Sequence, residues 1–466
     1  MGFLGMNKLF KAIAESLRGE HHDYTSGSLH RAVVLLSIPM VLEMAMESLF
    51  VVVDIFWVAH LGEKAVSTVG ITEAMFAIVF AAAMGLSAAA TATVARRIGE
   101  KNPEAASHAG AQAIILGGIV AIAFAIPGYW YGGDLLEWMS GSHSLAVYGS
   151  DFTKIMLAGT PGVILLFLNN AIFRGAGNAT IAMHALWLAN ACNMILDPLF
   201  IFGWGPVPAM GVTGAAVATT TGRSIGALYG FWRLYQGRGE LRLRRSHFTW
   251  DAPLMRQMVG IAAPAGFQYL VPTASWLGLM RIVAVFGGAA TAGYTIAIRI
   301  IIFVLLPAWG LSNAAATLVG QNLGAKQPER AEKSVIACGL YNMAFLVTVS
   351  IGLILFAEPL VRLFTQDDPV VRVAVECLRI LSYGYGFYAW GMVLIQAFNG
   401  AGDTRTPTLV NFACYWVVQL PLAYAWANWW GGGVAGVFWA VPVAEFLLAA
   451  VAYFLFRRGT WKKTVV

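Results

Sequence analysis

Charged residues are scarce in this sequence. Asp, Glu, Lys and Arg make up 12% of its 466 positions, whereas hydrophobic residues make up 58% and the mean hydropathy is +0.68. A soluble globular chain has about 25% charged residues, because its surface faces water. The scarcity of charge therefore excludes a soluble fold and indicates a polytopic membrane protein.

Several catalytic signatures are also absent from the sequence. It has no Walker phosphate loop, no zinc-type His and Glu spacing and no GxSxG elbow, so ATP-driven transport and hydrolase chemistry both lack their motifs. The four cysteines lie in apolar runs, where they behave as small hydrophobic residues, so no disulfide framework or metal cluster is indicated. We expect a protein that is not an enzyme, has no cofactor and draws energy from an ion gradient.

Apolar runs are the dominant feature that is present. Runs long enough to cross a bilayer as helices begin near Val33, Thr68, Ala109, Val147, Ile181, Val212, Val259, Ala289, Ser334, Val371, Pro407 and Val434. We predict an all-α integral membrane protein with twelve transmembrane helices. The stretch Lys8 to Arg18 alternates charged and apolar residues, so it does not resemble a cleavable signal; an interfacial helix and a disordered tail are the two alternatives there.

The second half of the sequence repeats the first with a constant offset in the numbering. Gly62 recurs as Gly287, Gly85-Leu86-Ser87 as Gly310-Leu311-Ser312, and Gly175-Ala176-Gly177 as Gly400-Ala401-Gly402, so the offset is 225 throughout. Six spans per copy make the copies parallel repeats, related by an axis along the membrane normal. We predict an N-terminal segment (1–32), an N-lobe (33–236), a linker (237–256), a C-lobe (257–457) and a tail (458–466).

Basic residues orient the chain, because cytoplasmic loops collect Lys and Arg. They cluster on one predicted side, after spans two and eight, between the halves and at the end: Arg96, Arg97, Lys101, Arg238, Arg242, Arg244, Arg245, Arg256, Lys326, Arg330, Lys333, Arg457, Arg458, Lys462 and Lys463. Both termini are therefore predicted to be cytoplasmic, at a prokaryotic inner (plasma) membrane. The net charge of +6 then reflects topology, so we expect a monomer that contacts lipid and small molecules but no nucleic acid.

Polar residues inside the spans concentrate in the first half. A carboxylate in a span costs about 2.5–3.5 kcal/mol, so it should face a polar interior. Span one carries Glu43, Glu47 and Asp54 on one helical stripe. Span five carries Asn190, Asn193 and Asp197 on another. Span four adds the amide pair Asn169 and Asn170. Such oxygens suit either an alkali cation or a proton. Asp197 and Asn193 have an alternative role, which is to hydrogen-bond backbone groups at a helix break before Pro198. The alternative for Glu43 is a charge that lines the cytoplasmic vestibule.

The second copy loses these groups. Asp54 corresponds to Leu279, Asp197 to Leu422, Asn193 to Val418 and Glu47 to Pro272. The polar residues of the second-half spans are mostly neutral and scattered, which is typical of a substrate-lining surface or of interhelical hydrogen bonding: Gln268, Arg299, Asn313, Tyr388, Gln396, Gln419 and Glu445. The comparison of the copies assigns ion coupling to the first lobe.

Four segments of the sequence together resemble one transporter family. They are residues 53–57 (Val-Asp-Ile-Phe-Trp), residues 193–198 (Asn-Met-Ile-Leu-Asp-Pro), residues 319–325 (Val-Gly-Gln-Asn-Leu-Gly-Ala) and the twin segments 174–178 and 399–403. The chain resembles the multidrug and toxic compound extrusion (MATE) transporters. The resemblance implies two six-helix lobes flanking a central cleft, and export of amphiphilic, often cationic compounds in exchange for sodium ions or protons.

The resemblance also assigns a cation site. Asp54 looks like the family's span-one aspartate, Asn193 and Asp197 look like its span-five pair, and Asn170 falls where a further asparagine is expected. In a sodium-coupled protein Asp54, Asn193 and Asp197 would be the metal ligands. Thr219 is the candidate for a span-six threonine; Thr213 and Thr220 are alternatives, because the repeat offset slips to 222 in that span.

The second lobe departs from one branch of the family. That branch carries a glutamate and an aspartate in spans seven and ten, whose places here fall near Pro272 and Tyr388, so the chain looks like the DinF-like branch. The remaining polar candidates, for the substrate cavity or an accessory role, are Glu43, Glu47, Asn169, Asn190 and Gln268.

We hypothesise a secondary active multidrug antiporter in which cation binding repacks the first lobe. Pro39 frees a backbone carbonyl in span one and gives that helix a place to bend. The alternative is a lipid or lipid-linked oligosaccharide flippase of related fold. A flippase would need a strongly cationic cavity. Arg223 and Arg299 are basic residues inside the spans, so the flippase alternative stays open.

Overall fold

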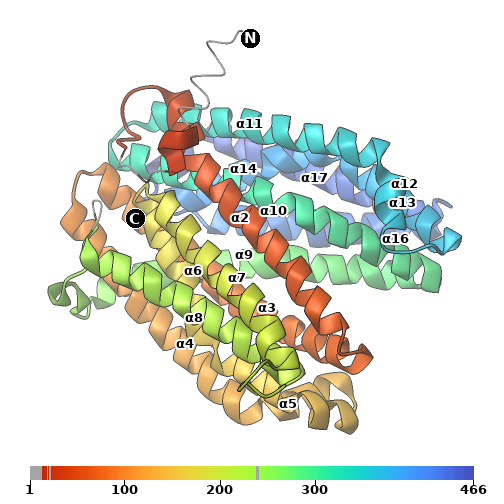
Figure 1. The fold of residues 1–466 in the computed structure, drawn as a ribbon. Coiled ribbons are helices and arrows are strands. Elements are labelled where there is room, and N and C mark those ends of the chain that lie inside the picture. The colour runs from red at the N-terminus through yellow and green to blue at the C-terminus, as the bar shows by residue number, and fades with distance from the viewer. Residues whose placement is uncertain (1–12, 18, 20–21, 238–240) are drawn as a thin grey trace.

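The computed structural model describes residues 13–466 except 18, 20–21 and 238–240, and most of these residues are helical (Figure 1). The interfacial helix considered for residues 8–18 lies largely outside the described residues. Its described part, residues 13–17, is helical, and the Thr180 hydroxyl donates a hydrogen bond of 2.7 Å to the Ser16 carbonyl.

The first half of the chain forms the six expected spans. Their helices are α2 (Leu29–Ala59), α3 (Glu63–Gly99), α4 (Pro103–Ser140), α5 (His143–Ala158), α6 (Thr160–Gly175), α7 (Ala179–Phe202) and α8 (Val212–Gln236). Helices α5 and α6 together make span four, which is interrupted at Gly159. An apolar core of α3, α4 and α6 residues holds this lobe together.

The second half repeats this plan. Its helices are α9 (Ala252–Ala284), α10 (Gly288–Gly324), α11 (Pro328–Leu355), α12 (Ala357–Arg362), α13 (Asp368–Tyr383), α14 (Tyr385–Ala401), α15 (Arg405–Phe412), α16 (Leu420–Asn428) and α17 (Gly433–Arg458). Span ten is interrupted at Gly384, which is the equivalent of Gly159 in the repeat. In span eleven a π-helical segment, η2 (Ala413–Gln419), joins α15 to α16 just before Pro421, which cannot donate a backbone hydrogen bond.

Matching loops set the start of α4 and α11. Lys101 and Lys326, which are equivalent in the repeat, both adopt a left-handed conformation with φ of 58°. Pro103 and Pro328 then occupy the first helical turn, where a missing N–H costs nothing. The repeat therefore extends to backbone conformation.

The helices are consistent with a multi-pass membrane protein. Nine helical segments of the described chain are long and apolar enough to cross a membrane. The three other expected spans are present as α8, α9 and the pair α13 and α14, which are less apolar or are interrupted. The predicted twelve-helix, two-lobe architecture is confirmed.

The first helix of each copy packs against the opposite lobe. Helix α2 lies along α10, and α9 lies along α3. A Cβ atom at Gly85 would lie 2.3 Å from the Ala262 carbonyl oxygen, and one at Gly310 would lie 2.3 Å from the Met40 carbonyl oxygen. The repeated glycines are therefore required where the lobes touch.

The lobes are joined at the end of the molecule where α2 begins and the chain ends, and they splay apart away from it (Figure 1). At the joined end the Arg96 guanidinium of the N-lobe donates to the carbonyls of Ala401 and Thr464, at 3.2 and 3.1 Å. The predicted tail packs here: Trp461 is fully buried and stacks on Phe456 with ring centroids 4.9 Å apart. The described linker docks on α4, where the Gln112 amide donates to the His247 carbonyl at 3.0 Å.

Candidate functional site

A central cavity of about 790 Å³ lies between the two lobes. Its walls come from α2, α3 and α6 of the N-lobe and from α9, α10, α14, α15, η2 and α17 of the C-lobe. Aromatic and apolar side chains dominate the lining, as is usual for sites that bind small molecules. The cavity is large enough for a drug-sized compound.

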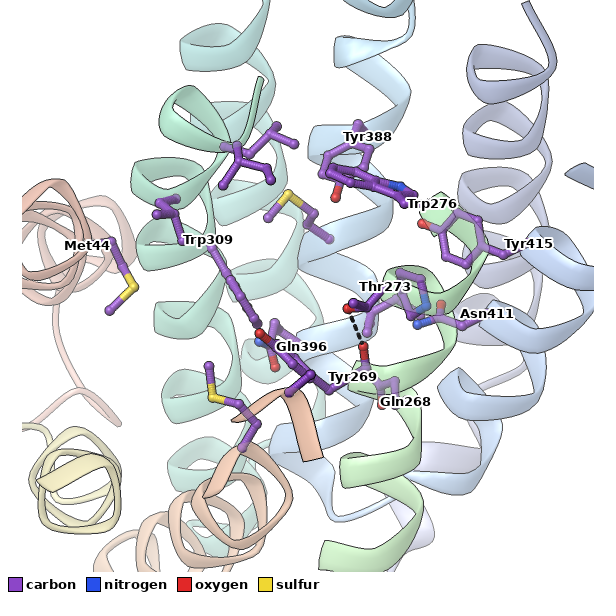
Figure 2. A pocket seen from close by; sticks show the side chains of 18 of the residues that line it. Met44, Gln268, Tyr269, Thr273, Trp276, Trp309, Tyr388, Gln396, Asn411 and Tyr415 are labelled. Carbon is purple, nitrogen blue, oxygen red and sulfur yellow. Dashed lines mark hydrogen bonds between the residues drawn. The ribbon is translucent and has the colours of Figure 1, made fainter. Parts of the chain in front are cut away.

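Aromatic and neutral polar side chains from the C-lobe point into this cavity (Figure 2). Tyr269 on α9 and Trp309 on α10 stack with centroids 6.1 Å apart. The Gln396 amide donates to Asn313 Oδ1 at 2.8 Å. Gln268 also lies in the lining, where the sequence predicted a substrate-cavity residue.

Four charged residues line the cavity: Glu73, Arg174, Arg299 and Glu445. Glu73 was not among the site residues predicted from the sequence. Its signal was available, because it is a lone carboxylate in the apolar run that forms span two. The charges of Glu73 and Arg299 interact, so Arg299 has the acidic neighbour that a deep arginine needs.

Glu43, on α2, is paired inside the N-lobe. Its Oε1 accepts hydrogen bonds from the Arg174 guanidinium at 2.7 Å and from the Asn170 amide at 3.0 Å. Glu43 is 1% exposed, so this ion pair is withdrawn from water. Asn170 therefore contacts Glu43, whereas the nearby Asn169 donates to the Ala227 carbonyl at 2.9 Å and joins α6 to α8.

Glu47, one helical turn further along α2, has a different arginine. Arg223 on α8 forms a bidentate pair with it, at 2.6 and 3.1 Å, and the Asn190 amide donates to the same carboxylate at 3.0 Å. The guanidinium also lies over the Phe50 ring, 4.7 Å from its centroid. Arg223 is thereby held against α2 by both a carboxylate and an aromatic ring.

The third carboxylate of α2, Asp54, lies with Asp197 of α7. The two negative charges interact with each other, and neither carboxylate has a salt bridge within the described part of the chain. The Asn193 amide donates to Thr219 Oγ1 at 2.9 Å and to Asp197 Oδ1 at 3.4 Å. Asp197 Oδ2 and Asn193 Oδ1 are buried and have no hydrogen-bond donor.

This arrangement fits a small cation. Two carboxylates, an amide oxygen and a hydroxyl are hard oxygen donors, and two of these oxygens lack a partner. Among the described residues no group of three His, Cys, Asp or Glu side chains is placed to hold a metal ion. Sodium and a proton both suit the cluster formed by Asp54, Asn193, Asp197 and Thr219, which we call the N-lobe acid cluster.

Comparison with known proteins places the chain in a family. The MatE family model matches it twice, over residues 39–199 and 264–425, so each lobe carries one copy of the family's unit. The chain belongs to the MatE family. The two matches begin at equivalent prolines of the repeat, Pro39 and Pro264.

MatE relatives match nearly the whole length of the chain. A probable multidrug resistance protein NorM of Thermotoga maritima is 28% identical and covers 94% of each chain. An FAD transporter of Shewanella oneidensis is 26% identical over 94% of this chain and 97% of its own. A solved structure described as the outward-facing conformation of a multidrug resistance MATE family transporter matches with a TM-score of 0.89 and 25% identity, over 95% of this chain and 98% of the other.

These relatives are transporters, which confirms the expected class: a membrane-embedded transporter of the MatE family and not an enzyme. Neither sequence relative is described as a flippase. The assignment to a DinF-like branch stays a prediction.

The remaining residues predicted from the sequence lie in the N-lobe interior or in the central cavity. The carboxylate stripe of α2 faces the N-lobe interior, because Glu43 and Glu47 contact polar groups of α6, α7 or α8 and the charge of Asp54 interacts with that of Arg223 on α8. Glu43, Glu47, Asn169 and Asn190 lie within the lobe and Gln268 lies in the central cavity. Pro39 is buried inside α2, which continues through it as one helix.

Proposed function

We propose that this MatE protein is a cation-coupled antiporter that exports amphiphilic, cationic compounds. One observation carries the proposal. Of the four carboxylates inside the N-lobe, Glu43 and Glu47 each form a salt bridge with an arginine, whereas Asp54 and Asp197 form none among the described residues, and Asp54 feels only the more distant charge of Arg223. Two mutually repelling acids without a salt bridge, beside buried oxygens that have no hydrogen-bond donor, favour binding of a cation from outside the protein.

Binding of a sodium ion or a proton at the N-lobe acid cluster would relieve this repulsion. The three elements that meet there, α2, α7 and α8, would then pack more closely. Helix α2 also lies along α10 of the other lobe, where the Ser48 hydroxyl donates to the Phe303 carbonyl at 3.1 Å. A change in α2, eased by the missing backbone donor at Pro39, is thus conveyed directly to the contact between the lobes.

The lining of the cavity supports the substrate class. Aromatic rings such as Tyr269 and Trp309 accept both apolar groups and organic cations. The flippase alternative needs a strongly cationic cavity to hold a pyrophosphate. Here the two arginines and two glutamates of the lining cancel in formal charge, so that alternative is not favoured.

Orientation follows from the basic residues. With Arg96, Arg97 and Lys101 in the cytoplasm, the joined end of the lobes is cytoplasmic and the cavity opens to the outside. The splayed arrangement in Figure 1 would then be an outward-facing state of an inner-membrane protein with both termini in the cytoplasm.

Transport in proteoliposomes tests the proposal. We expect wild-type protein to exchange a cationic dye against an imposed sodium or pH gradient, and Asp54→Asn and Asp197→Asn to lose this exchange. Asp134→Asn is the matched control, because Asp134 is an exposed aspartate near the end of α4. Imposing the two gradients separately identifies the coupling ion. Exchange at the wild-type rate by both cluster variants would refute the assignment.

A further inference from the structure

The C-lobe contains a buried acid that the N-lobe cluster does not explain. Glu445 on α17 is 4% exposed, and its Oε1 accepts a hydrogen bond of 2.9 Å from the Tyr415 hydroxyl. Both residues belong to the lining of the central cavity. Tyr415 lies in η2, and such π-helical segments recur at functional sites.

Glu445 forms no salt bridge with any residue that the structure describes. Within the described ranges no Lys, Arg or His lies within salt-bridge distance of it, and its hydrogen bond comes from the neutral hydroxyl of Tyr415. The groups that its charge reaches are Tyr388, Tyr415 and Cys414, none of which is basic. A buried carboxyl group without a basic partner is neutral when it holds a proton, and in its ionised form it attracts a cation from outside the protein.

The repeat shows what is missing. In the last span of each lobe the offset is 222 instead of 225, and the packing bears this out: Gly159 faces Thr220, and Gly384 faces Pro442. The same offset places Glu445 where the N-lobe has Arg223.

The partners of Arg223 are also replaced. At the offset of 225, Tyr415 stands in place of Asn190 and Pro272 in place of Glu47. In the N-lobe, Arg223 and Asn190 together hold the Glu47 carboxylate. In the C-lobe Tyr415 still provides a hydrogen-bond donor. The basic Arg223 is replaced by the acidic Glu445, and the acidic Glu47 is replaced by Pro272. The result is one carboxylate that faces the cavity with no basic side chain within salt-bridge distance among the described residues, although Arg174 and Arg299 line other parts of the same cavity.

We propose that Glu445 recognises the positively charged nitrogen of the exported compound. The surrounding rings suit such a group, because Tyr388 and Trp276 line the cavity together with Tyr415 (Figure 2) and aromatic faces attract organic cations. The ligand is thus an amphiphile with a quaternary or protonated amine attached to an apolar or aromatic body. This inference rests on the proposed export of cationic compounds, and it adds a C-lobe recognition site to the N-lobe coupling site.

Equilibrium binding to purified protein in detergent, without any gradient, tests the inference. Ethidium is the cationic probe and N-phenyl-1-naphthylamine the uncharged aromatic probe. We expect Glu445→Gln to weaken ethidium binding about tenfold or more, because a charge-assisted contact is lost, and to leave binding of the uncharged probe unchanged. Glu358→Gln, at an exposed glutamate outside the cavity, should bind both probes as wild type does.

Two further variants distinguish loss of the Glu445 charge from misfolding of the protein. Glu445→Asp keeps the charge and should retain more ethidium binding than Glu445→Gln. Tyr415→Phe removes the hydrogen bond but keeps the carboxylate, so its loss should be smaller than that of Glu445→Gln. Unchanged binding of the uncharged probe reports that the cavity is intact in each variant.

The outcomes separate this inference from the proposed function. If Glu445→Gln binds ethidium as tightly as wild type does, the recognition role is wrong even though antiport stands. If wild type shows no gradient-driven exchange but Glu445→Gln still weakens ethidium binding selectively, antiport is wrong and the recognition site stands. Wild-type protein that does not bind ethidium would overturn both.

Discussion

Gly99 and Gly324, equivalent residues of the two copies, face each other where α3 meets α10. A Cβ atom at Gly99 would lie 1.9 Å from the Gln321 carbonyl oxygen, and one at Gly324 would lie 2.1 Å from the Arg96 carbonyl oxygen and 3.0 Å from the Gly99 Cα. Arg96 and Gln321 are themselves equivalent in the repeat. Because equivalent residues touch only near a symmetry axis, the pseudo-two-fold axis between the lobes passes here.

A methyl group at this axis should push the lobes apart. We expect Gly99→Ala to destabilise the joined state by about 1–3 kcal/mol, as overpacking of a tight contact does. The midpoint of thermal unfolding in detergent should fall, and a cysteine placed beside the contact should react faster with a water-soluble maleimide. Gly118→Ala is the control, because nothing lies within 4 Å of its Cβ position. Equal behaviour of the two variants would mean that this contact does not close the molecule.

Loss of Arg174 should leave the buried Glu43 carboxylate without a basic partner inside the N-lobe. We expect Arg174→Gln to lower the free energy of unfolding by about 3–5 kcal/mol, because one partner of a buried pair is removed. The double variant with Glu43→Gln should recover much of that loss. Denaturant unfolding in micelles measures both. Arg362→Gln, at an exposed ion pair, should change stability little, and a similar loss in both arginine variants would contradict the argument.

Among the span-six threonines, Thr219 is the one that contacts Asn193. Thr219→Val should therefore remove an oxygen from the N-lobe acid cluster. We expect the affinity for the coupling ion to fall about tenfold, because a tenfold change corresponds to about the free energy of one good hydrogen bond. The concentration of sodium or protons that gives half-maximal exchange measures this change. Thr213→Val should leave it unaltered, and a shift in the Thr213 variant alone would reassign the site.

Restoring the backbone donor in α2 should stiffen it. Pro39→Ala supplies an N–H to the carbonyl one turn earlier and removes the ring that crowds it. We expect slower exchange with unchanged equilibrium binding of ethidium, because the change acts on movement and not on the cavity. Stopped-flow exchange and binding titrations provide the two measurements. An unaltered exchange rate would show that α2 does not bend at this residue.

Periodicity predicted the faces of the helices well but not their partners. The stripe of Glu43, Glu47 and Asp54 on α2 does face the N-lobe interior, because the 3.6-residue repeat fixes direction along one helix. The stripe cannot show that Glu43 meets Arg174, 131 positions away, while Glu47 meets Arg223, 176 positions away. Such pairings depend on how separate helices pack.

Two cavity acids show the same limit. Glu73 is a lone carboxylate in an apolar span, and Glu445 was grouped with scattered polar residues of the second half. Their shared location became evident only when α3 and α17 were placed around one cavity. Comparison of Arg223 with Glu445 also needed the packing of Gly159 and Gly384, because the repeat offset changes in the last span.

The sequence by itself determined that the chain lies in a membrane, that it contains two copies of one six-span unit, and that the first copy holds most of the buried acids. These properties follow from composition and spacing, which local physics links directly to helices and to lipid. The tertiary structure decided which acids are neutralised by arginine and which are not. That distinction depends on side chains brought together from distant helices, since the electrostatic energy of a buried charge is set by its nearest neighbours in space.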